Sequence, residues 1–201
     1  MISKLGSLDS FCFSMIACGV NDIYDILARE GHYKKIMYVE VDVGEIFFEE
    51  IYHLNGKSID KGLIFKPDIT KDFVIILGSG RDFLESLSKR LSYHIGINFI
   101  LMELNTEKSD NKKNGFTIYD GITSKKVREV ASFENSFGKM KFTEAGEPMY
   151  FENPEYYKRE KATDKINKEI ILEYVNKIGV DIGNDKIFET SKKCIFIDQE
   201  E

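Results

Sequence analysis

The residues best suited to binding a ligand form the short segment Gly78-Ser79-Gly80-Arg81, between an apolar run and a helical pattern. Backbone N–H groups at the start of a helix, together with a guanidinium, suit a phosphate or another anion. The segment lacks the third glycine of a dinucleotide fingerprint and the Gly-Lys-Ser/Thr of a P-loop. A tight turn is therefore the favoured interpretation, and anion binding by Gly78, Ser79, Gly80 and Arg81 is the alternative.

The histidines have no spacing typical of a metal site. His32, His53 and His94 are widely separated, and none stands in an HxH or HxxxH arrangement. His94 falls near the end of a predicted helix, where a cationic imidazole complements the negative end of the helix dipole. We therefore expect no metal and no other cofactor.

The three cysteines are few and odd in number, which favours reduced thiols in a cytoplasm over a disulfide framework. Cys12 and Cys18 lie in an apolar run, where a thiol stays protonated and unreactive. A disulfide between Cys12 and Cys194 is the less favoured alternative.

Acidic and aromatic side chains offer a different kind of site, a surface for a protein partner. Carboxylates near His53 would also suit acid–base or metal chemistry, but a solvated acidic surface is the commoner result. Exposed phenylalanines can anchor a partner, or they can pack beneath a loop. The candidate partner-binding residues are Asp42, Glu45, Glu49, Glu50, Phe133, Phe137, Glu144 and Glu147.

Four patterned segments are expected in the first third of the chain. The apolar run 11–18 predicts a buried strand or a short core helix, and a helix capped by Asn21 should follow it. Alternation in 37–43 predicts a half-buried strand, whereas 45–54 fits either a helix or a strand.

The middle of the chain predicts a strand–helix–strand unit near 73–102. The continuous apolar run 73–77 is typical of a strand covered on both faces. A helix over 82–95, with Asp82 as its cap, and a strand over 97–102 should follow.

The next part of the chain predicts a loop and a meander of strands. The wholly polar segment 105–114 indicates a surface loop, and Asp120-Gly121 indicates a two-residue hairpin turn after a strand over 115–119. Strands through 127–130 and 140–142 extend the meander.

The last part of the chain predicts one helix and one strand. Apolar residues recur at four-residue steps over 164–178, with Thr163 or Asp164 as the cap and Gly179 at the end. A strand over 194–197 follows.

These elements predict an α+β fold, with a mostly antiparallel sheet and helices packed on it. The links in the second half are too short for crossover helices, which is why antiparallel pairing is expected there. A length of 201 residues favours one domain over 1–201, with 57–70 as the place for any subdivision.

Composition and charge exclude several classes of protein. A 42% hydrophobic content supports a real core, and a formal charge of −6 argues against nucleic acid as a partner. No apolar run approaches the ~20 residues that span a bilayer. The run 11–18 has the wrong flanks for a secretion signal, so we expect a cytoplasmic protein without membrane contact.

One pattern combines a strand, a polar loop and a strand ending in Asp120-Gly121 with Arg128, Gly146-Glu147-Pro148 and Phe151-Glu152. Over about residues 98–152 it resembles uncharacterised bacterial proteins that are similar to immunity proteins of polymorphic or contact-dependent toxin systems. The resemblance implies a non-enzymatic protein that binds and occludes its partner.

The first hypothesis is therefore a non-catalytic protein-binding module, of the immunity type, that covers a basic toxin domain. Complementary charge speeds such an encounter, and a few aromatic anchors supply affinity. The alternatives are an α/β enzyme or ligand-binding domain that uses the Gly78–Arg81 turn, and an assembly subunit that associates through a sheet edge. The sequence leaves the oligomeric state open.

Overall fold

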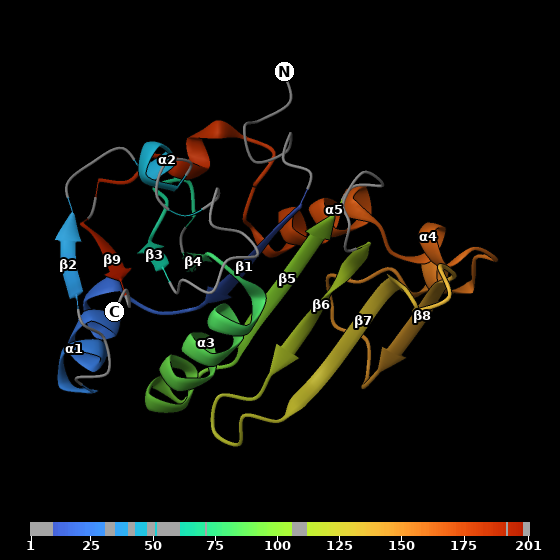
Figure 1. The fold of residues 1–201 in the computed structure, drawn as a ribbon, viewed down its shortest axis with the longest axis horizontal. Helices are drawn as coiled ribbons and strands as arrows, with labels where there is room; N and C mark the ends of the chain where they lie inside the picture. Colours follow the sequence, from blue (N-terminus) through green and yellow to red (C-terminus); the bar gives the residue numbers. More distant parts are fainter. Residues whose placement is uncertain are drawn as a thin grey trace.

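One nine-stranded sheet organises the computed structural model, which describes residues 10–30, 35–39, 43–47, 51, 61–70, 72–105, 112–191 and 193–198 (Figure 1). Each pair of neighbouring strands is antiparallel. Helices pack on the sheet, so the predicted α+β class with a mostly antiparallel sheet is confirmed.

The strands in chain order are β1 (Ser10–Ile16), β2 (Lys35–Val39), β3 (Lys61–Phe65), β4 (Val74–Gly78), β5 (Phe99–Asn105), β6 (Lys113–Tyr119), β7 (Lys126–Glu134), β8 (Met140–Ala145) and β9 (Cys194–Asp198). Their order across the sheet is β2-β9-β3-β4-β1-β5-β6-β7-β8. The α-helices are α1 (Val20–Glu30), α2 (Val43–Ile46), α3 (Arg81–Ile95), α4 (Ala162–Lys165) and α5 (Lys168–Ile178), and the 3₁₀ helices are η4 (Pro154–Lys158) and η5 (Asp185–Phe188).

The predicted strand–helix–strand unit is present as β4, α3 and β5. Both strands pair with β1, which lies between them, and they therefore run parallel to each other. α3 lies close to all three strands, and Gly78 makes this approach possible. A Cβ on Gly78 would come within 2.9 Å of Phe83 and Leu84. The glycine is thus explained by helix–sheet packing.

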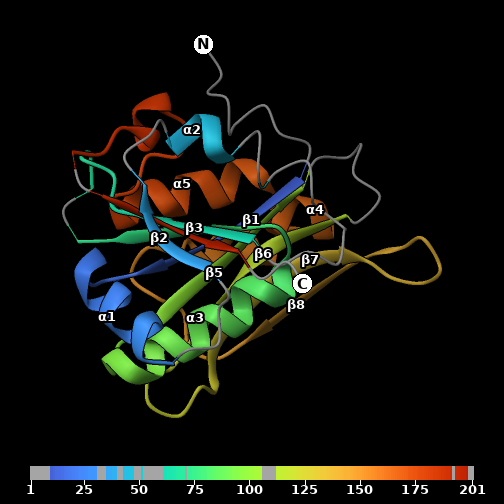
Figure 2. The same cartoon turned by 60° about the vertical axis from the view of Figure 1, so that its left-hand side comes forward.

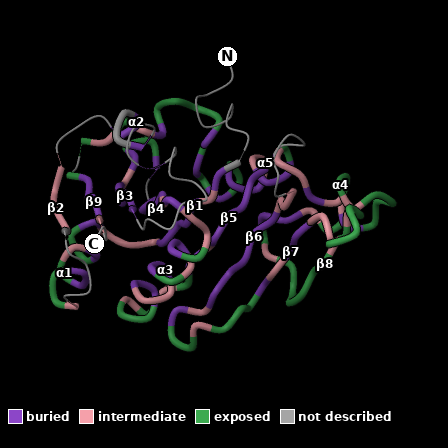
Figure 3. Tube along the Cα trace, in the orientation of Figure 1, coloured by how far each residue is buried: buried purple, intermediate pink, exposed green. Residues whose placement is uncertain are grey.

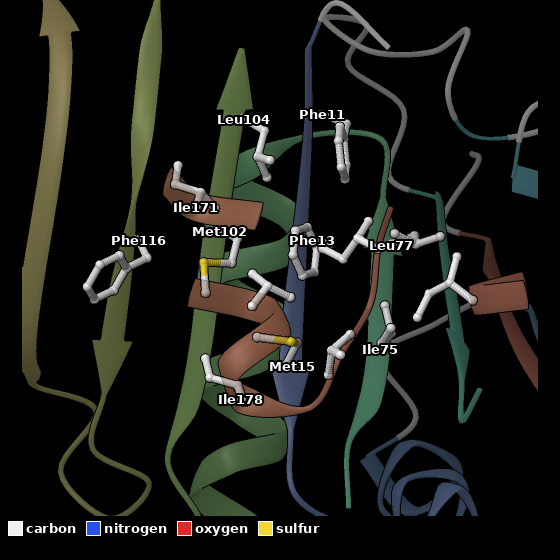
Figure 4. Packing of buried hydrophobic residues seen from close by; sticks show 14 of the residues in the cluster. Phe11, Phe13, Met15, Ile75, Leu77, Met102, Leu104, Phe116, Ile171 and Ile178 are labelled. Carbon is white, nitrogen blue, oxygen red and sulfur yellow. The ribbon is translucent and has the colours of Figure 1, made fainter. Parts of the chain in front are cut away.

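The sheet is covered on both faces, with α1 and α3 on one side and α2 and α5 on the other (Figure 2). We call the core between the sheet and α5 the α5 layer, and the core between the sheet and α3 the α3 layer. Successive residues of a strand point to opposite faces, so the side chains of β1 are divided between these two layers. Phe13 and Met15 enter the α5 layer, whereas Ile16 enters the α3 layer. Figure 4 shows the α5 layer, in which Ile171 and Ile178 pack over the strands.

Helix starts differ from the predictions. α1 begins at Val20, before the predicted cap Asn21. α3 is preceded by Gly80 in extended conformation, while Asp82 lies exposed in the first turn. Val43, predicted to end a strand, opens α2 instead, and the ambiguous segment 45–54 lies mostly outside the described residues.

The helix predicted over 164–178 is broken in two. Asn167 caps α5 by accepting a hydrogen bond from the Ile170 N–H (3.0 Å), so Thr163 and Asp164 belong to the separate α4. Ile166 keeps its place in the apolar pattern because it directly precedes the cap, where it can pack against the first turns of α5. Gly179 ends α5 with a φ of +99°, as predicted.

The connection between β6 and β7 is longer than the predicted two-residue turn. It runs from Asp120 to Lys125, and the Asp120 carboxylate accepts hydrogen bonds from the N–H groups of Ile122 and Thr123. An Asx-type turn thus replaces the tight hairpin turn. The ends of the polar segment 105–114 belong to β5 and β6, and its centre lies outside the described residues.

Burial falls off toward one side of the sheet. The central strands are buried, whereas β8 and the turn before it are largely exposed (Figure 3). Among the described strands, β8 is the most exposed, and the hairpin that it forms with β7 contains several of the residues that the sequence singled out.

Candidate functional site: the β7–β8 hairpin

The turn of the β7–β8 hairpin is built to hold an exposed aromatic side chain. Gly138, with a φ of +70°, donates its N–H to the Asn135 carbonyl oxygen (2.9 Å), and the Asn135 N–H donates to the Lys139 carbonyl oxygen (2.9 Å). The Asn135 side chain also accepts from the N–H of Phe137 (3.1 Å) and of Lys139 (3.0 Å). Phe137 lies in this ordered turn with 84% of its surface exposed.

Four of the predicted partner-binding residues lie on this hairpin or just beyond it. Phe133 stands opposite Lys141 and is half-buried, which corrects the expectation that it is exposed. Glu144 projects from the other face of β8, and Glu147 follows the strand and is exposed. The Glu144 carboxylate also accepts a long hydrogen bond from Arg128 Nη2 (3.4 Å). We call the exposed residues Phe137, Glu144 and Glu147 the hairpin surface.

The second predicted acidic group cannot be placed beside the hairpin surface. Asp42, Glu49 and Glu50 lie outside the described residues, as does the side chain of Glu45. Their role in partner binding stays a prediction.

Arg128 anchors the hairpin from beneath. Its side chain points into the α5 layer, and the residue is 2% exposed. The guanidinium binds the Glu152 carboxylate through Nε (3.0 Å) and Nη2 (2.6 Å). Its Nη1 donates to the carbonyl oxygens of Ala145 (3.2 Å) and Gly146 (2.6 Å). One side chain thus joins β7, the end of β8 and the segment that follows.

The buried carboxylate of Glu152 has its own further donors. It accepts from the Met149 N–H (2.7 Å) and from the Tyr157 hydroxyl (2.7 Å). Burial, followed by hydrogen bonds with Tyr174 and Glu152, raises the pKa of Tyr157, so the phenol stays protonated. Burial alone would lower the pKa of Arg128, but Glu152 outweighs it and the net pKa is raised. The network is a charged, fully hydrogen-bonded support for the hairpin rather than a proton-transfer site.

Sequence reasoning missed this network, although one signal was present. Arg128 shares its side of β7 with Val130 because the two residues are two positions apart in the strand. Val130 is apolar and buried, so Arg128 on the same side faces the core as well. A buried guanidinium requires a buried carboxylate, and Glu152 is that partner.

The predicted anion site at Gly78–Arg81 is engaged in contacts within the protein. Ser79 donates its N–H to the Lys61 carbonyl oxygen (3.0 Å), and its hydroxyl accepts from the Lys61 N–H (3.1 Å). Arg81 pairs with Glu85 (2.8 Å) and Glu103 (3.0 Å). Burial alone would lower the pKa of Arg81, but the two carboxylates outweigh it. The net pKa is raised, so the guanidinium stays charged. An anion would compete with both carboxylates, and anion binding here stays a prediction.

The cysteines are thiols with raised pKa values. Burial and, to a smaller extent, the negative charge of Glu103 raise the pKa of Cys12 to about 12. Burial and the negative charge of Asp22 raise the pKa of Cys18 to about 12 as well. Burial raises the pKa of Cys194 to about 11. A thiol with such a pKa carries little thiolate at neutral pH and is a poor nucleophile.

His94 lies in the last turn of α3, beside a cavity of about 590 Å³ between that turn and α1. Its Nε2 is 2.7 Å from the Glu30 carboxylate, and Asp22, Asp25 and Arg29 line the same cavity. Opposite charges are mixed in the lining, which gives no consistent attraction for one kind of ion. Within the described ranges, no three His, Cys, Asp or Glu side chains gather to hold a metal ion.

No family model, curated protein or solved structure matches the chain. The resemblance of 98–152 to immunity proteins therefore stays a prediction, as does a basic toxin domain as partner. In the described part of the chain, no helix has the length and apolar character needed to cross a bilayer.

Proposed function

We propose that the protein is a non-catalytic binding module of the immunity type, which neutralises a bacterial toxin by covering it with the hairpin surface. The observation that carries this proposal is Phe137, a large aromatic side chain 84% exposed on a turn whose backbone is fixed by four hydrogen bonds. Isolated exposed aromatics in ordered turns suit anchoring in a partner's pocket. Figure 2 shows the turn projecting beyond the body of the sheet.

The anchor is supported by a rigid base. Arg128 and Glu152 tie both strands of the hairpin to the segment that crosses beneath them. A surface that is already ordered loses little conformational entropy on binding, which favours tight association. Among the described residues, the candidate reactive groups are buried, paired or protonated, which favours binding over chemistry as the role of the arrangement; His32 and His53 lie outside the described residues.

Charge supports a basic partner. The chain has a formal charge of −6, and Glu144 and Glu147 flank the end of β8. An acidic surface accelerates the approach of a basic toxin domain and disfavours acidic competitors. Occlusion needs no catalytic group on the protein itself.

Phe137→Ala is expected to weaken capture of the toxin by about 30-fold or more, the effect of removing a hot-spot aromatic. The experiment is affinity capture from the producing organism, followed by titration of the captured partner with each variant. Ile122→Ala is the matched control, since Ile122 is also exposed (68%) but lies in the β6–β7 connection. The control should bind as the unmodified protein does.

Neutralisation is then measured on the purified partner. Its toxic activity should disappear at a one-to-one ratio with the unmodified protein, and it should persist with Phe137→Ala at the same concentration. A partner whose activity is unchanged by the protein, or equal binding by the two variants, would contradict the proposal.

A further inference from the structure

The cavity beside His94 lies between α1 and α3, which are neighbours on one face of the sheet (Figure 2). Four side chains of α1 line it: Asp22, Asp25, Ile26 and Arg29. Residues three, four and seven positions apart share one side of a helix, so these four form a single row, which we call the α1 row. At a rise of 1.5 Å per residue, the α1 row is roughly 10 Å long.

Opposite charges stand at opposite ends of the α1 row. Asp22 lies in the first turn of α1 and Arg29 in the last turn, with Asp25 and Ile26 between them. Ile95 of α3 adds a second apolar side chain to the lining. A simple ion is attracted to one end of such a row and repelled by the other. A ligand with an ammonium at one end, a carboxylate at the other and an apolar part between them matches the whole row.

The charged groups of the α1 row keep bonding capacity for such a ligand. The Arg29 Nε donates to the Asp25 carbonyl oxygen (2.8 Å), which holds the guanidinium in place through one nitrogen. In the described part of the chain, no carboxylate pairs with its two terminal nitrogens, which can bind a carboxylate at two points. Asp22 accepts from the Gly19 N–H through Oδ2 alone (3.2 Å), so its second oxygen can accept from an ammonium.

The wall that α3 contributes is already paired and adds no competing charge. The Glu30 carboxylate is 2.7 Å from His94 Nε2 and 4.0 Å from Arg90 Nη1. These contacts join the end of α1 to the last turns of α3. The shape of the cavity is thus fixed from within the protein, and the α1 row decides which ligand it attracts.

The dimensions of the cavity indicate the length of the ligand. Its volume of about 590 Å³ is within the range of small-ligand sites, roughly 300–1,000 Å³. An extended peptide spans at most about 3.3–3.6 Å per residue, so a row of roughly 10 Å corresponds to about three residues. A free peptide of that length has an ammonium at one end and a carboxylate at the other.

We propose that the cavity between α1 and α3 binds short peptides of about three residues with free termini and apolar side chains. The peptide ammonium lies against Asp22 and Asp25, and its carboxylate binds Arg29. Its apolar side chains pack on Ile26 and Ile95. This site is separate from the hairpin surface, so the inference goes beyond the proposed function and does not depend on a toxin.

The test is a titration of the protein with the tripeptide Ala-Leu-Ala, followed by amide chemical shifts. The free peptide should shift the amide signals of 22–30 and 94–95. The same peptide with an acetylated N-terminus, or with an amidated C-terminus, should bind about 10-fold more weakly, because each modification removes one charge-assisted contact.

Two variants assign the ends of the peptide. Arg29→Gln should weaken binding of the free peptide about 10-fold and remove the effect of amidation, while acetylation should still weaken binding. Asp25→Asn should reduce the effect of acetylation and leave the effect of amidation unchanged. A variant that merely disturbed the cavity would weaken all three peptides by the same factor.

Asp82→Asn is the matched control, because it removes an exposed carboxylate from the first turn of α3 and should leave the three affinities unchanged. Far-ultraviolet circular dichroism checks that each variant is folded. Unchanged signals of 22–30 on addition of the free peptide would overturn the proposal. Equal binding of the free and modified peptides would do so too, as would an effect of amidation that persists in folded Arg29→Gln.

Discussion

Arg128→Ala is expected to lower the free energy of unfolding by about 3–5 kcal/mol, the usual cost of removing one partner of a buried ion pair. The substitution leaves the Glu152 carboxylate buried with hydrogen bonds only from Met149 and Tyr157. It also removes the hydrogen-bond donor that the carbonyl oxygens of Ala145 and Gly146 share. Since domains of this size are stable by roughly 5–15 kcal/mol, the loss is large. Denaturant unfolding of the two proteins measures it.

A matched control is Lys158→Ala, which removes the cation of the exposed Lys158–Glu155 pair. Exposed pairs contribute little, so its effect should stay within about 0.5 kcal/mol. The double variant Arg128→Ala with Glu152→Ala should cost less than the sum of the two single variants, because the unpaired carboxylate is gone. An Arg128→Ala cost as small as that of Lys158→Ala would show that the network does not support the hairpin.

Gly146→Ala is expected to destabilise the protein by about 3 kcal/mol, for two independent reasons. Gly146 has a φ of +81°, a conformation that costs other residues about 1–3 kcal/mol. A Cβ at this position would also stand 2.0 Å from the Val127 carbonyl oxygen, a backbone atom that cannot move aside easily. Relieving that overlap requires β7 or β8 to shift, which costs a similar amount. Thermal or denaturant unfolding measures the effect.

Two other glycines separate these causes. Gly179 also has a positive φ, +99°, but there is open space where its Cβ would stand, so Gly179→Ala should show the conformational cost alone. Gly80 has an extended φ of −163° and equally open surroundings, so Gly80→Ala should be close to neutral. If Gly146→Ala lowers the free energy of unfolding by no more than Gly179→Ala does, the close approach of Gly146 to the Val127 carbonyl oxygen does not contribute to the loss of stability.

Local patterns were sufficient for the elements whose signals lie within one segment. The apolar run 73–77 and the helical period over 82–95 predicted β4 and α3, which the structure confirms within a few residues. The split between α4 and α5 was not predicted, because Ile166 satisfies the helical spacing although it lies outside both helices. Periodicity reports which side chains are buried, and capping residues such as Asn167 decide where a helix starts.

Strand order was beyond local patterns. β1 lies between β4 and β5, and β9 lies between β2 and β3, so segments from both ends of the chain complete the sheet. β3 was missed because only Leu63, Ile64 and Phe65 give it an apolar run, yet it is buried throughout. Such pairings join residues far apart in the chain, and no local period records them.

The hairpin surface was only partly predictable. Phe137 and Glu147 could be proposed as exposed because aromatic and acidic residues stood beside turn formers. The support beneath them depends on Arg128 and Glu152, which are 24 residues apart in sequence and meet only after β7 and β8 have paired. The sequence shows which residue types are present, but only the folded chain brings them together into one surface.

The most direct measurement of the proposed function is amide hydrogen exchange of the protein, alone and with the partner that affinity capture yields, at equal protein concentration. We expect slower exchange on binding in 133–147, with the strongest protection around Phe137. Protection confined to the Gly78–Arg81 turn or to the cavity beside His94, with 133–147 unchanged, would contradict the account.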